Sequence, residues 1–374
     1  MTFIKRLSLL IATMFLVSSA FAESYDDSCQ PCPPKPVCKT CDAPEAPTMS
    51  AYNHPARINV CGSWDMFVTG TFLWWQPKME GLELAVTDYT DTNAATQEFA
   101  GNIQDMSFDW KAAFKVGLGY NSEFDDWNLY LNYTRVNTSN STTAKAGTNK
   151  QHSLWLFNDL DISNQSFNQN PITETTGKWE LDHNMFDLEL GRPYYNGQNL
   201  IFKAHYGLKS GWIDQKFTVT GVRDPDAVTS FATIQNRKLT SSSWLIGPRT
   251  GFDSKWVFGE GFRLFGNAAV SAFFQKFDSI EDKNFETTSA ESPLMWRKHT
   301  YNTINTSLDL LLGLGWDTYF DNNNWYFDLS AGYEVQVYFN QNIFTQINSY
   351  VWVDHDKPGN LTFHGLTLTA RFDF

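Results

Sequence analysis

Two runs of alternating apolar and polar residues, joined by a short polar link, constrain this sequence more than any other feature. The runs cover residues 105–121 and 127–136, and the link covers residues 121–126. Alternation with a period of two indicates β-strands, and a short polar link between them indicates an antiparallel hairpin. Each run has the roughly 9–11 residues that a tilted strand needs to cross a bilayer, whereas strands of soluble proteins most often have about 5–6. The hairpin alone does not show whether its apolar face meets lipid or a protein core.

The same alternation recurs along the chain and predicts ten long strands. They cover residues 62–75, 105–121, 127–136, 178–190, 200–212, 242–252, 261–277, 304–316, 325–339 and 366–374. Their connections alternate between short and long, which is typical of short periplasmic turns and long extracellular loops. Closure is required in hydrocarbon, because an open sheet edge leaves backbone groups unpaired. We therefore predict an all-β fold, a closed antiparallel transmembrane β-barrel of about 10 strands, with 8–14 possible.

Composition agrees with this prediction. Aromatic residues make up 16% of the chain, yet the mean hydropathy is −0.37. Lipid-facing and lumen-facing residues alternate in a membrane barrel, which produces this combination. The net charge of −13 leaves no basic patch, so we expect no nucleic-acid partner.

In one predicted strand the apolar residues switch from odd-numbered to even-numbered positions. In residues 178–190 the apolar positions shift from Trp179, Leu181 and Met185 to Phe186 and Leu188. We interpret this change as a β-bulge near Met185.

The N-terminus predicts export. Residues 1–22 combine a cationic start, an apolar run and a closing Ala-Phe-Ala, which is typical of a secretory signal peptide. Residues 23–61 form a Cys/Pro-rich periplasmic segment that we expect to be disordered, and residues 62–374 form the barrel. These features predict an integral protein of the bacterial outer membrane.

All five cysteines lie early in the chain, at Cys29, Cys32, Cys38, Cys41 and Cys61. An exported chain enters an oxidising compartment, so all five are disulfide candidates. Because five is odd, at least one thiol stays free or pairs between molecules. Zinc binding and unpaired thiols are the alternatives, but the spacing between the two Cys-x-x-Cys pairs is too short for a usual zinc site, and we predict no metal site.

Charged residues recur on the polar face of the strands, which faces the lumen if the barrel closes. The basic group and one histidine are Lys111, Lys115, Lys203, His205, Lys209, Arg249 and Arg263. The acidic group is Asp309, Asp317, Asp328 and Glu334. A basic wall facing an acidic wall would create a transverse field that selects solutes. The alternative is that these groups pair with one another and fill a narrow lumen.

Three stretches carry a family resemblance. They are residues 67–75 with 81–85, residues 115–120 with 127–134, and residues 186–192 with 247–251 and 265–269. They resemble the Legionella-type major outer membrane protein family, which also occurs in chlamydia-like bacteria, over residues 62–374. The resemblance implies a pore-forming outer-membrane β-barrel. The Cys-rich segment is not part of that pattern. It is similar to segments of disulfide-linked chlamydial envelopes, which implies cross-links to itself or to other envelope proteins.

The last strand ends in Phe372 and Phe374, which resembles the signal read by the barrel assembly machinery. The remaining partners that we expect are outer-membrane lipid and small solutes. The seven histidines are scattered and no nucleophile motif accompanies them, so we expect no enzyme and no cofactor. We predict a porin-like protein for passive diffusion of small hydrophilic solutes or ions. The alternative is a structural or adhesive protein with a filled lumen and loop-mediated contacts.

Overall fold

A computed structural model describes residues 52–62, 64–93, 98–145, 150–156, 172–223, 234–286, 295–344 and 359–374. The chain divides into residues 1–40 and 41–374, and every described residue belongs to the second unit. The predicted signal peptide and most of the Cys/Pro-rich segment lie outside the described residues. Among the described residues, no helix is long and apolar enough to cross a membrane.

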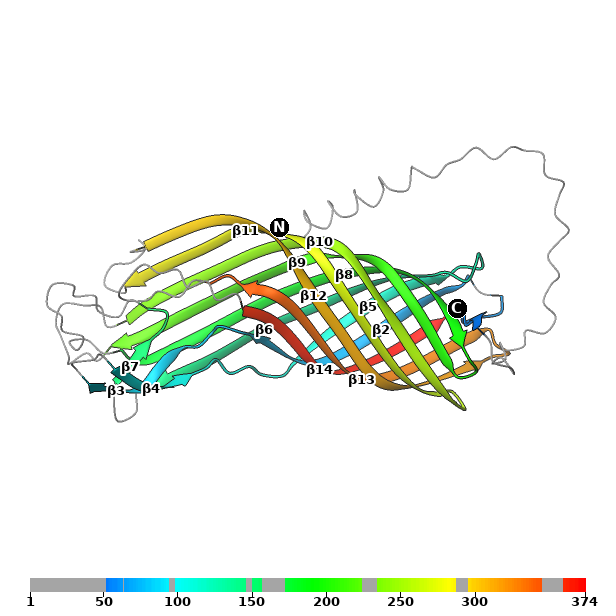
Figure 1. Ribbon diagram of the computed structural model, residues 1–374, viewed down its shortest axis with the longest axis horizontal. Helices are drawn as coiled ribbons and strands as arrows, with labels where there is room; N and C mark the ends of the chain where they lie inside the picture. Colours follow the sequence, from blue (N-terminus) through cyan, green and yellow to red (C-terminus); the bar gives the residue numbers. More distant parts are fainter. Residues whose placement is uncertain are drawn as a thin grey trace, which may run out of the picture. The chain divides into compact units, whose positions relative to one another are not determined.

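Ten antiparallel strands form a closed ring (Figure 1). They are β2 (Met66–Met79), β5 (Lys111–Asn121), β6 (Asn128–Lys145), β8 (Ile172–Asn196), β9 (Leu200–Arg223), β10 (Ile234–Gly259), β11 (Phe262–Glu286), β12 (Met295–Phe320), β13 (Trp325–Asn342) and β14 (Gly359–Asp373). Each strand pairs with the next in this order, and β14 pairs with β2 to close the ring. The predicted fold class and the strand count of about ten are therefore confirmed.

Four short strands lie beside the ring. β1 (Tyr52–Pro55) pairs with the end of β8 near the β8–β9 turn. β3 (Ala85–Asn93) pairs with β4 (Glu98–Gln104) and with β7 (Lys150–Ser153). β7 also joins β8 at Gln151, so this small sheet continues the wall of the barrel.

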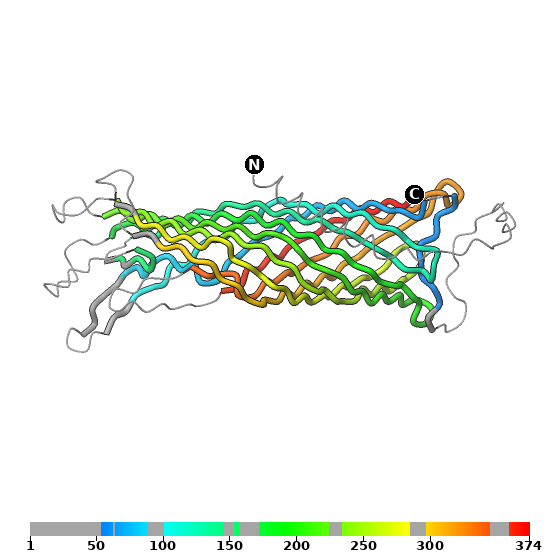
Figure 2. The backbone as a smooth tube through the Cα atoms, turned by 90° about the horizontal axis from the view of Figure 1, so that it is seen from above, coloured from blue at the N-terminus to red at the C-terminus, as the bar shows by residue number. Residues whose placement is uncertain are grey.

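Several strands are about twice as long as a membrane crossing requires. Strands β8 to β12 have 24 to 26 residues each, against about 9–11 for a tilted strand in a bilayer. The extra length lies at the end opposite the short turns, which is the extracellular end (Figure 2). The wall of the barrel therefore continues past the membrane.

The apolar side chains of a strand move from its outward face to its inward face where the strand leaves the membrane. On β9 the even-numbered side chains face outward, and as far as Trp212 all of them except Ser210 are apolar or aromatic. Beyond Trp212 the outward residues are Asp214, Lys216, Thr218 and Thr220. The inward residues change in the opposite sense, from Lys203, His205 and Lys209 to Ile213, Phe217 and Val219. On β9 the lower barrel thus has a polar inside and an apolar outside, whereas the upper barrel has a polar outside and an inside with many apolar side chains.

This inversion corrects the bulge that the sequence predicts near Met185. The pairing of β8 with β6 and with β9 runs through Met185 without a register shift. Trp179, Leu181 and Met185 all face inward and are 0%, 2% and 1% exposed, whereas Phe186 and Leu188 face outward. The apolar residues switch from inward to outward positions because the environment of each face changes. The alternation of the backbone itself stays regular.

The apolar core lies inside the upper barrel. Its members come from strands around the ring and include Trp75 of β2, Trp179 of β8 and Phe363 of β14. Connecting segments add further side chains: Leu84 follows β2, and Trp155 follows β7 and lies 4.9 Å from the ring centroid of Phe217. The upper barrel is therefore packed as the core of a soluble β-barrel is.

Candidate functional site

A cavity of about 510 Å³ lies below this core, inside the membrane-spanning part of the barrel. Inward side chains from all ten ring strands line it, and residues 54–58 of the N-terminal segment line it as well. Most of these side chains are charged or carry hydroxyl or amide groups, because the inward face of each strand is polar at this level. The predicted lumen residues are therefore expected on the walls of this cavity.

Nine of the eleven predicted lumen residues line the cavity. They are Lys115, Lys203, His205, Arg249, Arg263, Asp309, Asp317, Asp328 and Glu334. Lys209 is fully buried next to it. Lys111 does not line the cavity and lies 3.6 Å from a carboxylate oxygen of the exposed Asp109.

Lys209 is the centre of a buried ion-pair network. Its Nζ lies 3.3 Å from Asp187 Oδ1 and 3.3 Å from Asp309 Oδ2. The same ammonium donates a hydrogen bond of 3.1 Å to the Tyr338 hydroxyl. Arg249 contacts Asp309 as well. Burial of a charge is costly unless partners and hydrogen bonds compensate it, so the members of this network hold one another in place.

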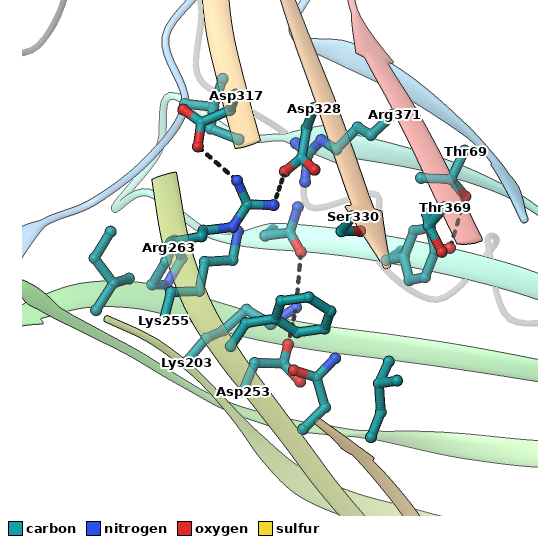
Figure 3. Close-up of a pocket in the computed structure, with 18 of the residues that line it drawn as sticks. Thr69, Lys203, Asp253, Lys255, Arg263, Asp317, Asp328, Ser330, Thr369 and Arg371 are labelled. Atoms are coloured by element: carbon teal, nitrogen blue, oxygen red, sulfur yellow. Dashed lines mark hydrogen bonds and ion pairs between the residues drawn. The ribbon is translucent and has the colours of Figure 1, made fainter. Parts of the chain in front are cut away.

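Further pairs follow toward the periplasmic end. Lys115 Nζ lies 2.5 Å from Glu334 Oε1, and Lys203 Nζ lies 2.8 Å from Asp253 Oδ2. Arg263 binds two carboxylates, each at 2.5 Å, from neighbouring segments of the ring (Figure 3). The acids and bases that the sequence places on separate walls therefore form direct pairs.

Several pairs bridge strands that are not neighbours in the ring. Lys209 of β9 meets Tyr338 of β13, and Lys115 of β5 meets Glu334 of β13. Such contacts pass through the lumen and link strands that do not pair with each other.

On the inward faces of the ring strands, five charged residues line the cavity that the sequence-based prediction of lumen residues does not include: Asp187, Glu189, Asp253, Lys255 and Arg371. All five continue the alternating face that located the other residues. Asp253 and Lys255 fall between the predicted strands at residues 242–252 and 261–277, but β10 extends to Gly259. Continuing the alternation past Phe252 would have found both.

The N-terminal segment at residues 52–62, here called the periplasmic strap, contacts three of the short turns. The Ala56 backbone N–H donates to Pro193 O at 3.2 Å, beside the β8–β9 turn. Arg57 Nη1 donates to Asn121 O at 3.2 Å, at the β5–β6 turn. The Cys61 backbone N–H donates to Asn323 O at 2.9 Å, in the β12–β13 turn. The strap therefore runs across the periplasmic mouth and bounds the cavity from below.

Cys61 is disulfide-bonded. The other candidates, Cys29, Cys32, Cys38 and Cys41, lie outside the described residues, so disulfide connectivity and cross-linking stay predictions. The Phe372 ring stacks on Trp325 with centroids 5.2 Å apart, and the Phe374 backbone N–H donates to Met66 O at 3.0 Å. The role of Phe372 and Phe374 as an assembly signal also stays a prediction. Over the described ranges, no group of three or more His, Cys, Asp or Glu side chains could hold a metal ion.

A closed ring of antiparallel strands with an apolar outer belt defines an integral β-barrel of the bacterial outer membrane. A family model described as the Legionella pneumophila major outer membrane protein precursor matches residues 59–374. The chain therefore belongs to this family, as the resemblance in its sequence predicts. The predicted location, integral in the outer membrane, is confirmed with it.

Solved structures show weaker similarity. A Pseudomonas aeruginosa FadL homologue is 10% identical with a TM-score of 0.26, and the match covers 83% of this chain and 89% of that one. The TodX deltaS2S3 mutant monoaromatic hydrocarbon channel is 9% identical with a TM-score of 0.24, covering 84% and 91%. Vibrio cholerae OmpT is 10% identical with a TM-score of 0.17, covering 84% and 100%. These values are too low to support an argument, and the fold rests on the strand pairing. A search of the curated proteins found no significant match.

Proposed function

We propose that this protein is a structural outer-membrane barrel whose lumen is filled. Its outward apolar belt contacts lipid, and its long strands raise a polar wall above the membrane. Contacts with other molecules would then be made by the surface of this wall and by the extracellular loops.

The contacts that cross the upper lumen carry this proposal. The His183 ring of β8 lies 4.8 Å from Phe363 of β14 and 5.1 Å from Tyr338 of β13, measured between centroids. β8 is separated from β14 by three strands in one direction around the ring, so these rings meet across the lumen. Phe363, Tyr338 and His183 are each 0% exposed, so they are closed off from bulk solvent. A solute path at this level requires these side chains to move.

Single-channel recording tests the proposal. The mature chain, refolded in detergent and shown to be folded by heat-modifiable gel migration, is added to a planar bilayer. We expect no discrete conductance steps. We expect steps from the double variant His183→Ala with Phe363→Ala, because it removes the rings that meet across the lumen. The matched control, Phe252→Ala, changes an outward ring of the belt and should stay silent.

Discrete steps from the unaltered chain would overturn the filled-lumen proposal and favour a second function, passive diffusion of small hydrophilic solutes or ions. The charged cavity of about 510 Å³ favours this second function, because a polar lumen at membrane depth suits hydrated solutes. Under it, neutralising Lys203 and Lys209 should shift the ion preference of the steps. An unchanged preference would show that these two residues do not line the conducting path.

A further inference from the structure

Lys255 is a cation of the cavity whose ammonium group makes no ion pair in the described part of the chain. It lies on the inward face of β10, is half-buried, and lines the cavity beside Arg263 (Figure 3). No carboxylate lies within 4.0 Å of its Nζ among the described residues, and none of them accepts a hydrogen bond from it. An ammonium group in a confined site of low dielectric is stabilised by a counter-ion, so this lysine lacks the partner that its neighbours have.

Three acids that line the same part of the cavity are paired with other bases (Figure 3). Asp253, two residues earlier on β10, pairs with Lys203 at 2.8 Å. Asp317 and Asp328 both pair with Arg263 at 2.5 Å. Moving one of them to Lys255 would break a pair that already exists. The cavity therefore presents Lys255 to whatever enters it.

A second donor of the same region is also unused. Arg263 is 5% exposed, and its two terminal nitrogens bind carboxylates. Its Nε is buried and has no hydrogen-bond partner. In Figure 3 the Arg263 and Lys255 side chains lie next to each other, and Arg371 of β14, Ser330 and Thr369 line the other side of the view.

We propose that this part of the cavity binds a small oxyanion, such as a phosphate or carboxylate group. Lys255 supplies the charge, and Arg263 Nε becomes a further N–H donor when the buried guanidinium group shifts toward the ligand. Charge-assisted hydrogen bonds to oxyanions are short and strong, and a guanidinium group beside an ammonium group suits several oxygens at once. In a filled barrel the ligand enters from the periplasm, past the strap that runs across that mouth, and in a conducting barrel it can enter from either side. The proposal does not depend on whether the lumen conducts.

Calorimetric titration of inorganic phosphate into the refolded mature chain in detergent tests the site. We expect saturable binding with one phosphate per chain at low ionic strength, weakening as salt screens the charges. Lys255→Gln should weaken binding at least tenfold. The matched control is Lys238→Gln on the same strand, because Lys238 is exposed on the outside of the upper barrel. It should bind phosphate as the unaltered chain does.

Absence of saturable binding to the unaltered chain would overturn the proposal, and so would equal affinity of the Lys255→Gln and Lys238→Gln variants. If Lys255→Gln fails to fold, Lys255→Arg provides the test, because it keeps the charge and the donors. That variant should bind phosphate within about threefold of the unaltered chain. A folded Lys255→Arg variant without binding would contradict the role given to the charge.

Discussion

Phe217 offers a direct test of the apolar core in the upper barrel. Its side chain points inward from β9, is 0% exposed, and packs edge-on against Trp155 and parallel to Phe344. In a barrel with a water-filled lumen, an inward side chain above the membrane would be hydrated. Phe217→Ala should then have little effect on stability. In the filled barrel it leaves a cavity.

The expected loss is large. An aromatic side chain in a core buries about 150–250 Å². Removing roughly 150 Å² of it, at about 25 cal/mol per Å², costs about 4 kcal/mol. Measured Phe→Ala substitutions in protein cores cost about 3–5 kcal/mol, which includes the cavity that remains. We expect Phe217→Ala to lower the free energy of unfolding by this amount.

The assay is equilibrium unfolding of the refolded barrel in urea, followed by tryptophan fluorescence, with the midpoint and slope compared between variants. Thr218→Ala is the matched control, because Thr218 is the next residue on β9 and faces outward above the membrane. Its effect should stay within about 0.5 kcal/mol. A loss below about 1 kcal/mol for Phe217→Ala would refute a packed core at this level.

Three further predictions follow from other parts of the barrel. Lys209→Met removes the fully buried cation of the network and leaves Arg249 as the remaining basic partner of Asp187 and Asp309, which should cost about 3 kcal/mol in the same unfolding assay; a loss below 1 kcal/mol would show that the network is hydrated. Gly207→Val should give no heat-modifiable folded form, because a side-chain carbon at this position would collide with a backbone carbonyl of β8; a folded variant would contradict the close approach of the strands. Outside the membrane, hydrogen bonds from Lys283 and Lys298 hold the pKa of Glu281 below its ordinary value of 4.5, so its small stabilising contribution is present at neutral pH and is lost as the pH falls through the lowered pKa. Lys298→Ala should raise this pKa in an NMR titration of the carboxyl group, and an unchanged pKa would remove the pair from the account.

The number and order of the ring strands could be predicted because alternation survives wherever one face meets lipid. The strand ends could not be predicted, because alternation of hydrophobicity fades where both faces are polar. β6 continues to Lys145 through residues rich in Ser, Thr and Asn. Its inward side chains there include the buried polar Thr138 and Asn140, so no apolar stripe marks the strand.

The change of the apolar face above the membrane explains why the sequence predicts a β-bulge near Met185 that the structure does not have. A sequence records which residues are apolar, and it does not record which face they occupy. On β8 the same regular alternation places Trp179 inward and Phe186 outward. A register shift and a change of solvent produce the same pattern, and only the pairing with β6 and β9 separates them.

The charged lumen could be located from the sequence, but its pairs could not. Alternation places Lys115 and Glu334 on inward faces, yet their contact depends on how far β5 and β13 are staggered around the ring. That stagger is a property of the closed barrel and not of either strand. The sequence predicts two separate charged walls because the pattern of each strand gives its inward residues without the height at which they meet the residues of other strands.

Solvent access to Phe217 tests the central claim, a filled lumen above a charged cavity, most directly. Fluorophenylalanine is placed at position 217 or at the belt position Phe252, and the barrel is reconstituted into lipid nanodiscs. ¹⁹F NMR line widths are then recorded with two probes. One is a water-soluble gadolinium chelate, and the other is dissolved oxygen, which concentrates in lipid. Phe252 is 46% exposed on the outer face, so oxygen should broaden its signal while the chelate does not. The signal at position 217 should resist both probes. Broadening of that signal by the chelate would show a water-filled lumen and contradict the account.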